Sequence, residues 1–459
     1  MKNILGIDLG TSSVKMIYDD GKTVHKVKEK YEEITPDGWM AAIKKCASRL
    51  DLNGLRAVGL SSQVGTYLVD FKEVISWNSP EGKDELDEIL DRASREEFID
   101  EIGMPHPNII SYPLPRLLYI KKHYPQTKFV CQPKDWLCYA LGGNYVSDKF
   151  SWRGLASLGG EGYSRKLLQR FGLEGFALPS LSSPTATVAH VTREGSAISG
   201  IPEGTEIVVG CNDFFAGLLG MGIINEGDAF DITGTSEHLG LLTAAIPEND
   251  DSLVCGPYFN HNAHYGVTGS SGKSLDFGLS LCDFGRLDLE KCLAKNPPIF
   301  LPYLTGERAP IWDKDARGVF FGISEGCDNE LLSYSVLEGV CFSIYHIYET
   351  MGKPKIGSLT VSGGASKDAL MNKMKASLFN CPVCVPYETD SSAYGAVMLA
   401  SVGMGDFESV KAAIAENCRK NPSATPDADL GNKLRERFEI YKGLYPALKG
   451  NFALLKNNS

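Results

Sequence analysis

The pattern of apolar and polar positions along the chain predicts strands that alternate with helices. Two apolar stretches, Asn3–Asp8 and Val14–Tyr18, flank the small, hydroxyl-rich segment 9–13 and predict a β-hairpin. Apolar residues then recur at helical spacing over Pro36–Leu50, and the apolar stretch Leu55–Ser61 predicts another strand. A strand–helix–strand order of this kind indicates an α/β architecture.

The beginning of the chain is repeated near its middle. Two further apolar stretches surround a second short turn, and the tripeptide Gly-Thr-Ser occurs in both turns, at residues 10–12 and 234–236. The offset between the two tripeptides is about half of the 459 residues. This repetition predicts a duplicated domain. We expect an N-terminal domain over residues 1–222 and a C-terminal domain over residues 223–459.

The remaining pattern continues the alternation of strands and helices. We expect a strand over Leu359–Ser362 that ends at Gly363-Gly364-Ala365, followed by a helix over Asp368–Phe379. The stretch 175–192 contains two prolines and predicts mostly loop. A C-terminal helix over Asp429–Leu444 is expected to end before Pro446, because proline interrupts helical hydrogen bonding.

Composition and charge exclude several classes of protein. Lys and Arg number 46 and Asp and Glu 57, so the net charge is −11, which argues against a nucleic-acid binder. No run of about eighteen apolar residues predicts a membrane span, and the short N-terminal apolar stretch does not resemble a signal peptide. The cysteines are scattered, which predicts reduced thiols and a cytoplasmic location.

Glycine is the unusual component of the chain. The 48 glycines exceed the ~7% of ordinary usage and follow no period, so we expect many of them at special turns. A turn of Gly, Thr and Ser exposes backbone N–H groups and hydroxyls, which together bind phosphate oxygens. Two such turns are able to hold one polyphosphate, and Gly363-Gly364-Ala365 is able to lie against a nucleotide base. The alternative is that these segments are only tight turns.

Two aspartates stand where chemistry is possible. Asp8 ends the first predicted strand beside the first turn, where it is able to hold Mg²⁺ directly or through water. A carboxylate there also commonly caps a turn. Asp213 lies between an apolar strand and an apolar helix, where it either caps the helix or acts as a general base aimed into a cleft.

These motifs resemble those of the FGGY carbohydrate kinases, a branch of the actin/hexokinase/Hsp70 ATPase superfamily. The resemblance covers nearly the whole chain and implies an α/β fold of two actin-like (ribonuclease H-like) domains that flank a deep catalytic cleft. Six segments carry it in order: Gly6–Lys15, Pro133–Leu137, Gly210–Asp213, Gly234–Ser236, Tyr303–Gly322 and Ser362–Ala365.

The resemblance also implies an activity and a set of site residues. The chain would use ATP and Mg²⁺ to phosphorylate a hydroxyl of a sugar or polyol, with Asp213 as catalytic base and with Asp8 and Asp213 at the metal. The implied ATP- and phosphate-binding residues are Gly10, Thr11, Ser12, Lys15, Gly234, Thr235, Ser236, Gly272, Gly363, Gly364, Ala365 and Asp368. The implied substrate-binding residues are Gln63, Val64, Trp77, Trp152, Asp213 and Phe214.

The implied sugar pocket departs from the pattern of the xylulokinase-like members of the family. Gln63-Val64-Gly65-Thr66 stands where those members have Gln-Met-His-Gly, and Phe214 follows Asp213 where they place Asn or Gln. We therefore expect the acceptor to be a ketose or an open-chain polyol, and the sequence does not identify which one. The positive charge of Arg153 is also compatible with an acidic or phosphorylated sugar. The rings of Trp77 and Trp152 are suited to stack on a sugar. The alternative is that they are ordinary tryptophans of the hydrophobic core.

Two other functions are compatible with the same fold. One is a phosphohydrolase of polyphosphates or nucleotides, against which the segment Gly306-Glu307-Arg308 argues because it is specific to the FGGY family. The other is a non-catalytic sugar sensor, against which the retention of Asp8 and Asp213 argues. The expected partner is a small carbohydrate, with neither a nucleic acid nor a membrane, and we expect a homodimer.

Overall fold

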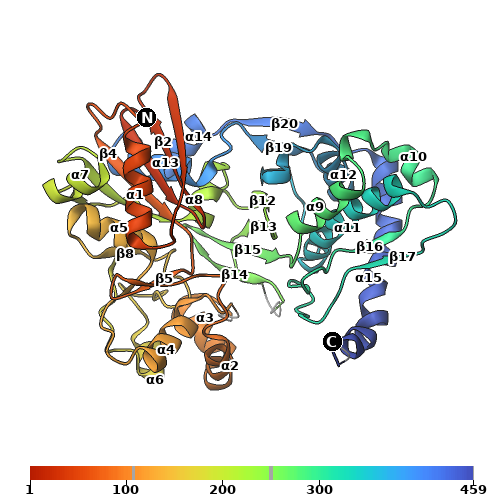
Figure 1. The fold of residues 1–459 in the computed structure, drawn as a ribbon, viewed down its shortest axis with the longest axis horizontal. Helices are drawn as coiled ribbons and strands as arrows, with labels where there is room; N and C mark the ends of the chain where they lie inside the picture. Colours follow the sequence, from red (N-terminus) through yellow and green to blue (C-terminus); the bar gives the residue numbers. More distant parts are fainter. Residues whose placement is uncertain (106–108, 248–251, 458–459) are drawn as a thin grey trace. The chain divides into compact units, whose positions relative to one another are not determined.

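The computed structural model describes residues 1–105, 109–247 and 252–457 and shows two compact units (Figure 1). The first unit consists of Met1–Ile224, Gly256–Asn260 and Asp390–Cys418, and the second of Asn225–Cys255, His261–Thr389 and Arg419–Ser459. Residue 224 lies beside the expected boundary at residue 222. The units differ from two continuous halves because segment 390–418, with helix α13 (Ser391–Gly403), packs on the first unit.

The first unit is built on a six-stranded sheet in the order β10-β11-β4-β1-β2-β3. The predicted hairpin is present as β1 (Ile4–Leu9) and β2 (Ser13–Asp19), and β3 (Val24–Lys30) continues it antiparallel. Strand β4 (Ala57–Ser62) runs parallel to β1, and β11 (Glu206–Asn212) runs parallel to β4. Strands β1 and β4 are buried on both faces, as expected for parallel strands covered by helices.

The second unit repeats this order of strands. Its seven-stranded sheet runs β14-β15-β13-β12-β18-β19-β20, and β12, β13 and β15 form an antiparallel meander like β1, β2 and β3. Strands β18 and β19 then follow in parallel, like β4 and β11. The two units thus share one order of central strands, which is what a duplicated domain would show. The strands are β12 (Ala229–Thr233), β13 (Glu237–Thr243), β14 (Val254–Tyr258), β15 (His261–Val267), β18 (Leu359–Gly363), β19 (Val383–Pro386) and β20 (Lys420–Ala424).

Helices cover both sheets. Those of the first unit are α1 (Pro36–Ala47), α2 (Lys83–Arg92), α3 (Arg95–Ile102), α4 (Pro113–His123), α5 (Pro133–Gly142), α6 (Arg165–Phe171), α7 (Arg193–Ser199), α8 (Asp213–Gly220), α13 and α14 (Val410–Asn417). Those of the second unit are α9 (Gly272–Leu281), α10 (Leu289–Ala294), α11 (Asn329–Thr350), α12 (Ala369–Phe379) and α15 (Ala428–Asn457).

Short strands complete the two units. They are β5 (Tyr67–Val69), β6 (Glu73–Ile75), β7 (Val130–Cys131), β8 (Val146–Asp148), β9 (Ser180–Ser182), β10 (Thr187–His190), β16 (Ile299–Leu301) and β17 (Val319–Phe321). The stretch 175–192, for which we expected mostly loop, therefore contains β9 and β10. Strand β10 forms because it pairs antiparallel with the buried strand β11 at the edge of the first sheet.

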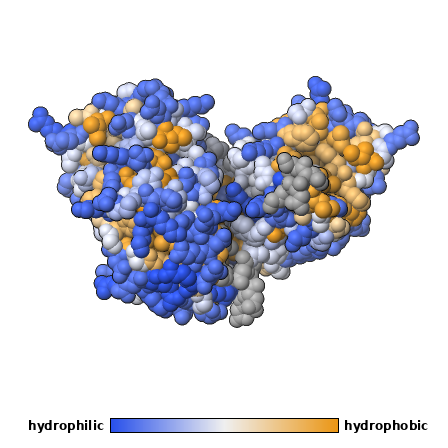
Figure 2. All heavy atoms as spheres, turned by 60° about the horizontal axis from the view of Figure 1, so that its bottom comes forward, coloured by the Kyte–Doolittle hydropathy of each residue, from blue (hydrophilic) through white to orange (hydrophobic). Residues whose placement is uncertain are grey.

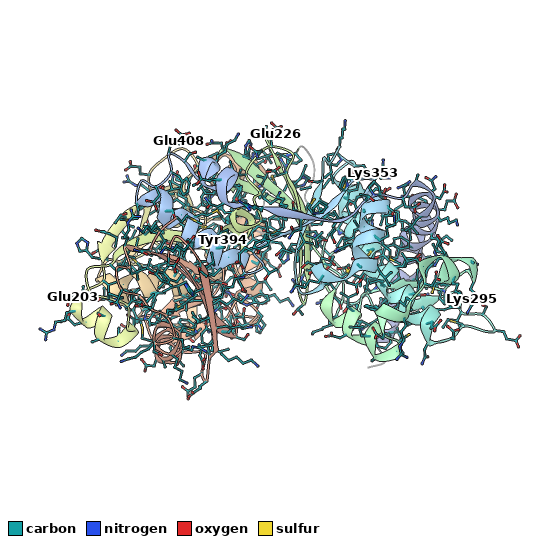
Figure 3. The ribbon with its side chains drawn as sticks, turned by 90° about the horizontal axis from the view of Figure 1, so that it is seen from above. Glu203, Glu226, Lys295, Lys353, Tyr394 and Glu408 are labelled. Carbon is teal, nitrogen blue, oxygen red and sulfur yellow. The ribbon has the colours of Figure 1, made fainter. Side chains whose placement is uncertain are left out.

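Several glycines allow α13 to approach the first sheet closely. A Cβ atom on Gly59 of β4 would lie 2.1 Å from the carbonyl oxygen of Ala396, and one on Gly395 would lie 1.9 Å from that of Ala216 in α8. A Cβ atom on Gly6 would lie 2.2 Å from the carbonyl oxygen of Ala393. Gly6 thus faces α13. Tyr394 of α13 lies inside this unit, whereas Glu203 and Glu408 point outward (Figure 3).

The C-terminal helix α15 is longer than expected. It continues through Pro446 to Asn457, so the prediction that it ends before the proline was wrong. The reason is packing on both sides of the proline, since Leu444 and Phe452 are both buried in the core of the second unit. Tertiary burial here outweighs the local cost of a proline inside a helix.

Hydrophobic side chains also gather on the surface of the second unit, as the orange area on the right of Figure 2 shows. Among the large exposed apolar residues of this unit are Phe277 and Leu279 of α9 and Phe321 of β17. The Phe300 and Phe320 rings pack 4.5 Å apart between these elements. Within the described ranges, the structure contains no helix with the length and hydrophobicity that a bilayer crossing requires.

Candidate active site

The turn between β1 and β2 presents hydroxyl groups at the end of the first sheet. The backbone N–H of Gly10 donates to the carbonyl oxygen of Ser13 at 3.1 Å, which closes the turn and leaves Thr11 and Ser12 exposed. Thr11 Oγ1 accepts a hydrogen bond from the indole nitrogen of Trp77 at 3.0 Å. Thr11 and Trp77, predicted for different ligands, are therefore direct neighbours. Phosphate binding by Gly10, Thr11 and Ser12 stays a prediction.

Asp8 lies at the end of β1, directly opposite Lys15 in the β1–β2 ladder. The Asp8 side chain is buried, and its Oδ1 has no hydrogen-bond partner in the described part of the chain. Lys15 Nζ lies 2.9 Å from Asp390 Oδ1. Burial raises the pKa of Asp8 to about 6, the positive charge of Lys15 opposes this shift, and the negative charge of Asp390 adds to it.

Local backbone geometry places Asp213 at the end of β11. The pairing of β11 with β4 is irregular between Val208 and Cys211, where Gly210 has a φ of +69°. A Cβ atom on Gly210 would lie 1.6 Å from the carbonyl oxygen of Leu60, so this bulge requires glycine. The Asn212 side chain then caps α8 by accepting the N–H of Phe215 at 2.9 Å. Asp213 itself is consequently not the capping residue.

The Asp213 carboxylate is fixed by backbone donors. Its Oδ1 accepts the N–H of Phe214 at 2.8 Å and the N–H of Val64 at 3.2 Å. Burial raises the pKa of Asp213 to about 7, the negative charge of Asp8 adds to this shift, and the two N–H groups oppose it. A carboxylate whose pKa lies near neutrality is suited to act as a general base that accepts a proton from an alcohol.

The same two carboxylates fit a magnesium ion. Magnesium in phosphoryl-transfer sites is typically held by one or two carboxylates together with phosphate oxygens and water. Asp8 Oδ1 is a buried oxygen that accepts no hydrogen bond from the described residues, and the charge of Asp8 acts on Asp213. The described residues include no group of three or more His, Cys, Asp or Glu side chains that would form a complete protein cage.

The predicted acceptor residues near Asp213 differ in their exposure. Gln63 is buried, with its Oε1 accepting the Thr66 hydroxyl at 3.2 Å and its Nε2 bound to no described residue. Trp77 is 38% exposed and therefore available to a ligand. Its loop is held by the buried guanidinium of Arg116, which donates to the carbonyl oxygens of Ser76, Trp77, Ser79 and Glu81. No local sequence pattern marks Arg116 for this role.

Trp152 does not belong to an open site, and this corrects its prediction as a sugar contact. Its side chain is fully buried, and its indole nitrogen donates to Asp135 Oδ2 at 3.0 Å. The rings of Tyr67 and Tyr163 pack edge-on against it, with centroid distances of 5.9 and 5.3 Å. The indole N–H is thus hydrogen-bonded and the ring is packed within the core. Trp152 is therefore a core tryptophan, which was the alternative to a sugar contact.

The second unit contains a cavity of about 650 Å³ that gathers many of the predicted nucleotide-binding residues. It lies where β12 and β18 end and where α9 and α12 begin. The turn after β12 is tied to α9, because Gly234 and Thr235 accept the N–H groups of Gly272 and Ser271 at 2.9 and 3.0 Å. The predicted residues that line the cavity are Gly234, Thr235, Gly272, Gly364, Ala365 and Asp368.

Two predicted residues of this region do not line the cavity. Gly363 has a φ of +94°, and a Cβ atom there would lie 1.9 Å from the carbonyl oxygen of Thr233 on the neighbouring strand. Its glycine is therefore explained by the close approach of two strands. Ser236 follows the turn on the way into β13 and is absent from the lining. Nucleotide contact by these two residues stays a prediction.

Sequence reasoning missed the apolar walls of the cavity. Leu279 of α9, Phe284 after it and Met371 of α12 all line it, and such side chains suit the two faces of a flat base. Lys273 and Asp276 of α9 add one charge of each sign. The helical periodicity of residues 272–281 was available in the sequence. The pattern does not reveal which face of the helix borders a ligand.

A buried charge cluster lies behind the turn after β12. Lys375 Nζ lies 2.5 Å from Asp231 Oδ2 and 2.7 Å from Glu237 Oε1, and all three side chains are fully buried. Glu237 Oε2 also accepts the Ser271 hydroxyl at 2.8 Å, next to Gly272. Burial raises the pKa of Asp231 and Glu237 adds to this shift, whereas Lys375 opposes it. The cluster therefore connects α12 to the turn after β12 and to the start of α9.

If this cavity binds a nucleotide as predicted, filling it should weaken ATP binding. We expect Thr235→Trp to raise the Kd for ATP at least about tenfold, or ~1.4 kcal/mol, because the indole would occupy space beside Gly234 and Gly272. Fluorescence or calorimetric titration with ATP measures this change. Thr425→Trp, at an exposed position of the same unit, is the matched control. Equal ATP affinity in the two variants would show that ATP does not use this cavity.

Comparison with known proteins finds the same family in both halves of the chain. The model of the FGGY family of carbohydrate kinases, N-terminal domain, matches residues 3–220, and that of the C-terminal domain matches residues 231–404. A xylulose kinase of Lactococcus lactis subsp. lactis (strain IL1403) is 28% identical, over 97% of each chain. A gluconokinase of Bacillus licheniformis is 23% identical, over 99% of this chain and 98% of its own.

A solved structure supports the same fold. The ligand bound xylulose kinase from Lactobacillus acidophilus aligns with a TM-score of 0.85 at 23% identity, and the alignment covers 98% of this chain and 99% of that one. The predicted fold class, α/β with two actin-like domains, is thereby confirmed.

Proposed function

Since the chain belongs to the FGGY family of carbohydrate kinases, we propose that it transfers the γ-phosphate of Mg-ATP to a hydroxyl of a ketose or an open-chain polyol. Family membership makes the chain a phosphotransferase that acts on a small carbohydrate. The observation that carries the finer proposal is Asp213, a carboxylate that is held by two backbone N–H groups and whose pKa is raised to about 7.

In the proposed reaction, Asp213 removes the proton of the acceptor hydroxyl as its oxygen attacks the γ-phosphorus. The new P–O bond forms while the bond between the γ-phosphorus and its bridging oxygen breaks, and ADP leaves. The cavity between β12, β18 and α9 supports nucleotide binding by the second unit. Asp8 and Asp213 would hold the metal. Mg²⁺, when bound, supplies positive charge that neutralises the phosphate oxygens.

A screen of acceptors tests this proposal. ADP release is measured for the full chain with ATP, Mg²⁺ and single ketoses, polyols and sugar acids, and the product is identified by mass spectrometry. Phosphorylation of at least one acceptor is the expected result. ATP consumption that is equally fast without any sugar would indicate a phosphohydrolase, and sugar binding without turnover would indicate a sensor. Either outcome would contradict a carbohydrate kinase.

Asp213 should also set the pH dependence of the reaction. Because the base must be deprotonated, kcat/KM is expected to fall about tenfold per pH unit below a pH of about 7. A pH series of kcat/KM at saturating Mg-ATP measures this fall. Constant kcat/KM from pH 8 to pH 5 would contradict a base with this pKa.

A further inference from the structure

A second cavity, of about 600 Å³, lies wholly within the first unit. It is bordered by the segment after β8, which contributes Lys149, Phe150 and Arg153, and by Ser182 and Ser183 at the end of β9. Arg153, which the sequence analysis connected with an acidic or phosphorylated sugar, lines it, whereas Gln63, Val64, Trp77, Trp152, Asp213 and Phe214 do not. The cavity therefore needs an explanation of its own.

Arg153 connects this cavity to the candidate base. The side chain is only 7% exposed, and its guanidinium carbon lies 4.8 Å from the ring centroid of Phe215 and 5.7 Å from that of Phe214. Both rings belong to the first turn of α8, immediately after Asp213. A third ring, Tyr112, lies 5.5 Å away. The cation is thus held by aromatic faces at the element that carries Asp213.

The cavity wall carries more positive than negative charge. Lys149 Nζ donates to the carbonyl oxygens of Gly160 and Ser157 at 2.8 and 3.4 Å, and these dipoles orient the ammonium without cancelling its charge. Lys149 forms no ion pair with any residue that the structure describes. Glu161 is exposed and is the one acidic side chain among the described lining residues. Two cations and several hydroxyls thus surround the cavity.

The segment that carries these cations is rigidly held. Asp148 Oδ1 accepts the N–H groups of Phe150 and Ser151 at 2.8 and 2.9 Å, and its Oδ2 lies 3.1 Å from the buried Lys134 Nζ. Gln132 Nε2 donates to the carbonyl oxygen of Ser151 at 2.6 Å. The Phe150 carbonyl in turn accepts Asn212 Nδ2 at 2.8 Å, beside Asp213. Such preorganisation lowers the entropic cost of binding a charged group.

We propose that this cavity binds a negatively charged group of the acceptor, so that the preferred substrate is a carbohydrate with a carboxylate or a phosphate group. The inference rests on the proposed kinase function and narrows its substrate class. Arg153 and Lys149 bind the anionic end, Ser182 and Ser183 suit hydroxyl groups, and the hydroxyl to be phosphorylated lies toward Asp213. Arginine beside a carboxylate or a phosphate forms two parallel hydrogen bonds, which a neutral hydroxyl cannot match.

Matched pairs of acceptors test the inference. Steady-state kcat/KM is compared for gluconate and glucitol and for xylulose 5-phosphate and xylulose, so that a carboxylate and a phosphate are tested separately. We expect the anionic member of at least one pair to be preferred at least tenfold. Arg153→Gln should lower kcat/KM for that member at least tenfold and change it for the neutral member less than threefold. Arg153→Lys should restore part of the loss, because it restores the charge.

Two further variants and a binding measurement separate a role of the charge from general damage to the first unit. Lys149 is exposed, so Lys149→Gln tests the same cavity without removing a buried side chain. Arg165→Gln removes an exposed arginine of the same unit and should change neither acceptor. Calorimetric titration with the same compounds, without ATP, measures binding apart from turnover.

Three outcomes are distinguishable. A preferred neutral member in both pairs would overturn the inference and leave the kinase function intact. Binding of the anions that Arg153→Gln abolishes, without turnover of any acceptor, would support the cavity assignment and contradict the kinase function. Equal losses for charged and neutral acceptors in Arg153→Gln would overturn the charge-specific role and indicate a structural one.

Discussion

Replacing Asp213 with Asn is expected to lower kcat by about 10²–10⁴-fold, because an amide cannot accept the proton of the acceptor hydroxyl. Asn has nearly the same shape as Asp, and its side-chain oxygen is still able to accept the N–H groups of Val64 and Phe214. The loss should therefore be one of chemistry with little change of fold. Steady-state kinetics with the best acceptor, and thermal unfolding of the same preparation, measure the two effects.

Nucleotide binding separates this prediction from general damage. The cavity that we assign to ATP lies within the second unit, whereas Asp213 belongs to the first, so the Kd for ATP measured without Mg²⁺ should change less than about threefold. Glu203→Gln, an exposed carboxylate of the first unit, is the matched control and should retain full activity. Wild-type kcat in Asp213→Asn would remove Asp213 as the base.

Replacing Lys375 with Met is expected to lower the free energy of unfolding by about 3–5 kcal/mol, because removing one member of a buried ionic cluster leaves its partners uncompensated. Asp231 and Glu237 would remain fully buried without their ammonium. Urea unfolding followed by circular dichroism measures the change in the transition of the second unit. The Kd for ATP should also rise, since Glu237 holds Ser271 next to Gly272, which lines the cavity that we assign to ATP.

A neighbouring lysine gives the control for this prediction. Lys373 lies on the same helix, and its ammonium is 3.6 Å from Asp427 at the surface, with about a third of its side chain exposed. Lys373→Met should cost no more than about 1 kcal/mol, as for other exposed ion pairs. Equal destabilisation by the two substitutions would show that burial of the cluster does not determine its contribution.

Local sequence patterns predicted the first strands and turns of both units but not the contacts between segments that are distant in the chain. The hairpin before residue 20 and the repeated turn at Gly234 follow from short patterns of apolar and small residues, and the structure has both. Pro446 misled the prediction of the last helix, because a local rule carried no information on the burial of Leu444 and Phe452. That α15 continues past Pro446 could only be judged from tertiary packing.

The sites show the same limit. The aspartates at the ends of β1 and β11 could be selected because each follows an apolar strand and precedes small or apolar residues. Trp152 was chosen for its chemistry, and only its contact with Asp135 shows that it belongs to the core. Lys375 meets partners more than 130 residues away in the chain, so no local pattern marks it. Arg153 was noted in the sequence, but its contacts with the rings of Tyr112, Phe214 and Phe215 were not predictable from a local pattern.

The return of segment 390–418 to the first unit has a consequence for how the protein is made. A ribosome synthesises the strands of the first sheet early, but the helix that packs on Gly6 and Gly59 is among the last parts to emerge. Until then, one face of that sheet lacks its permanent cover. A fragment that ends at residue 222 lacks the helix altogether. The nascent chain therefore completes the central strands of the second sheet before the first unit is able to close, and the second unit itself still waits for β20 and α15, which follow α13 in the chain.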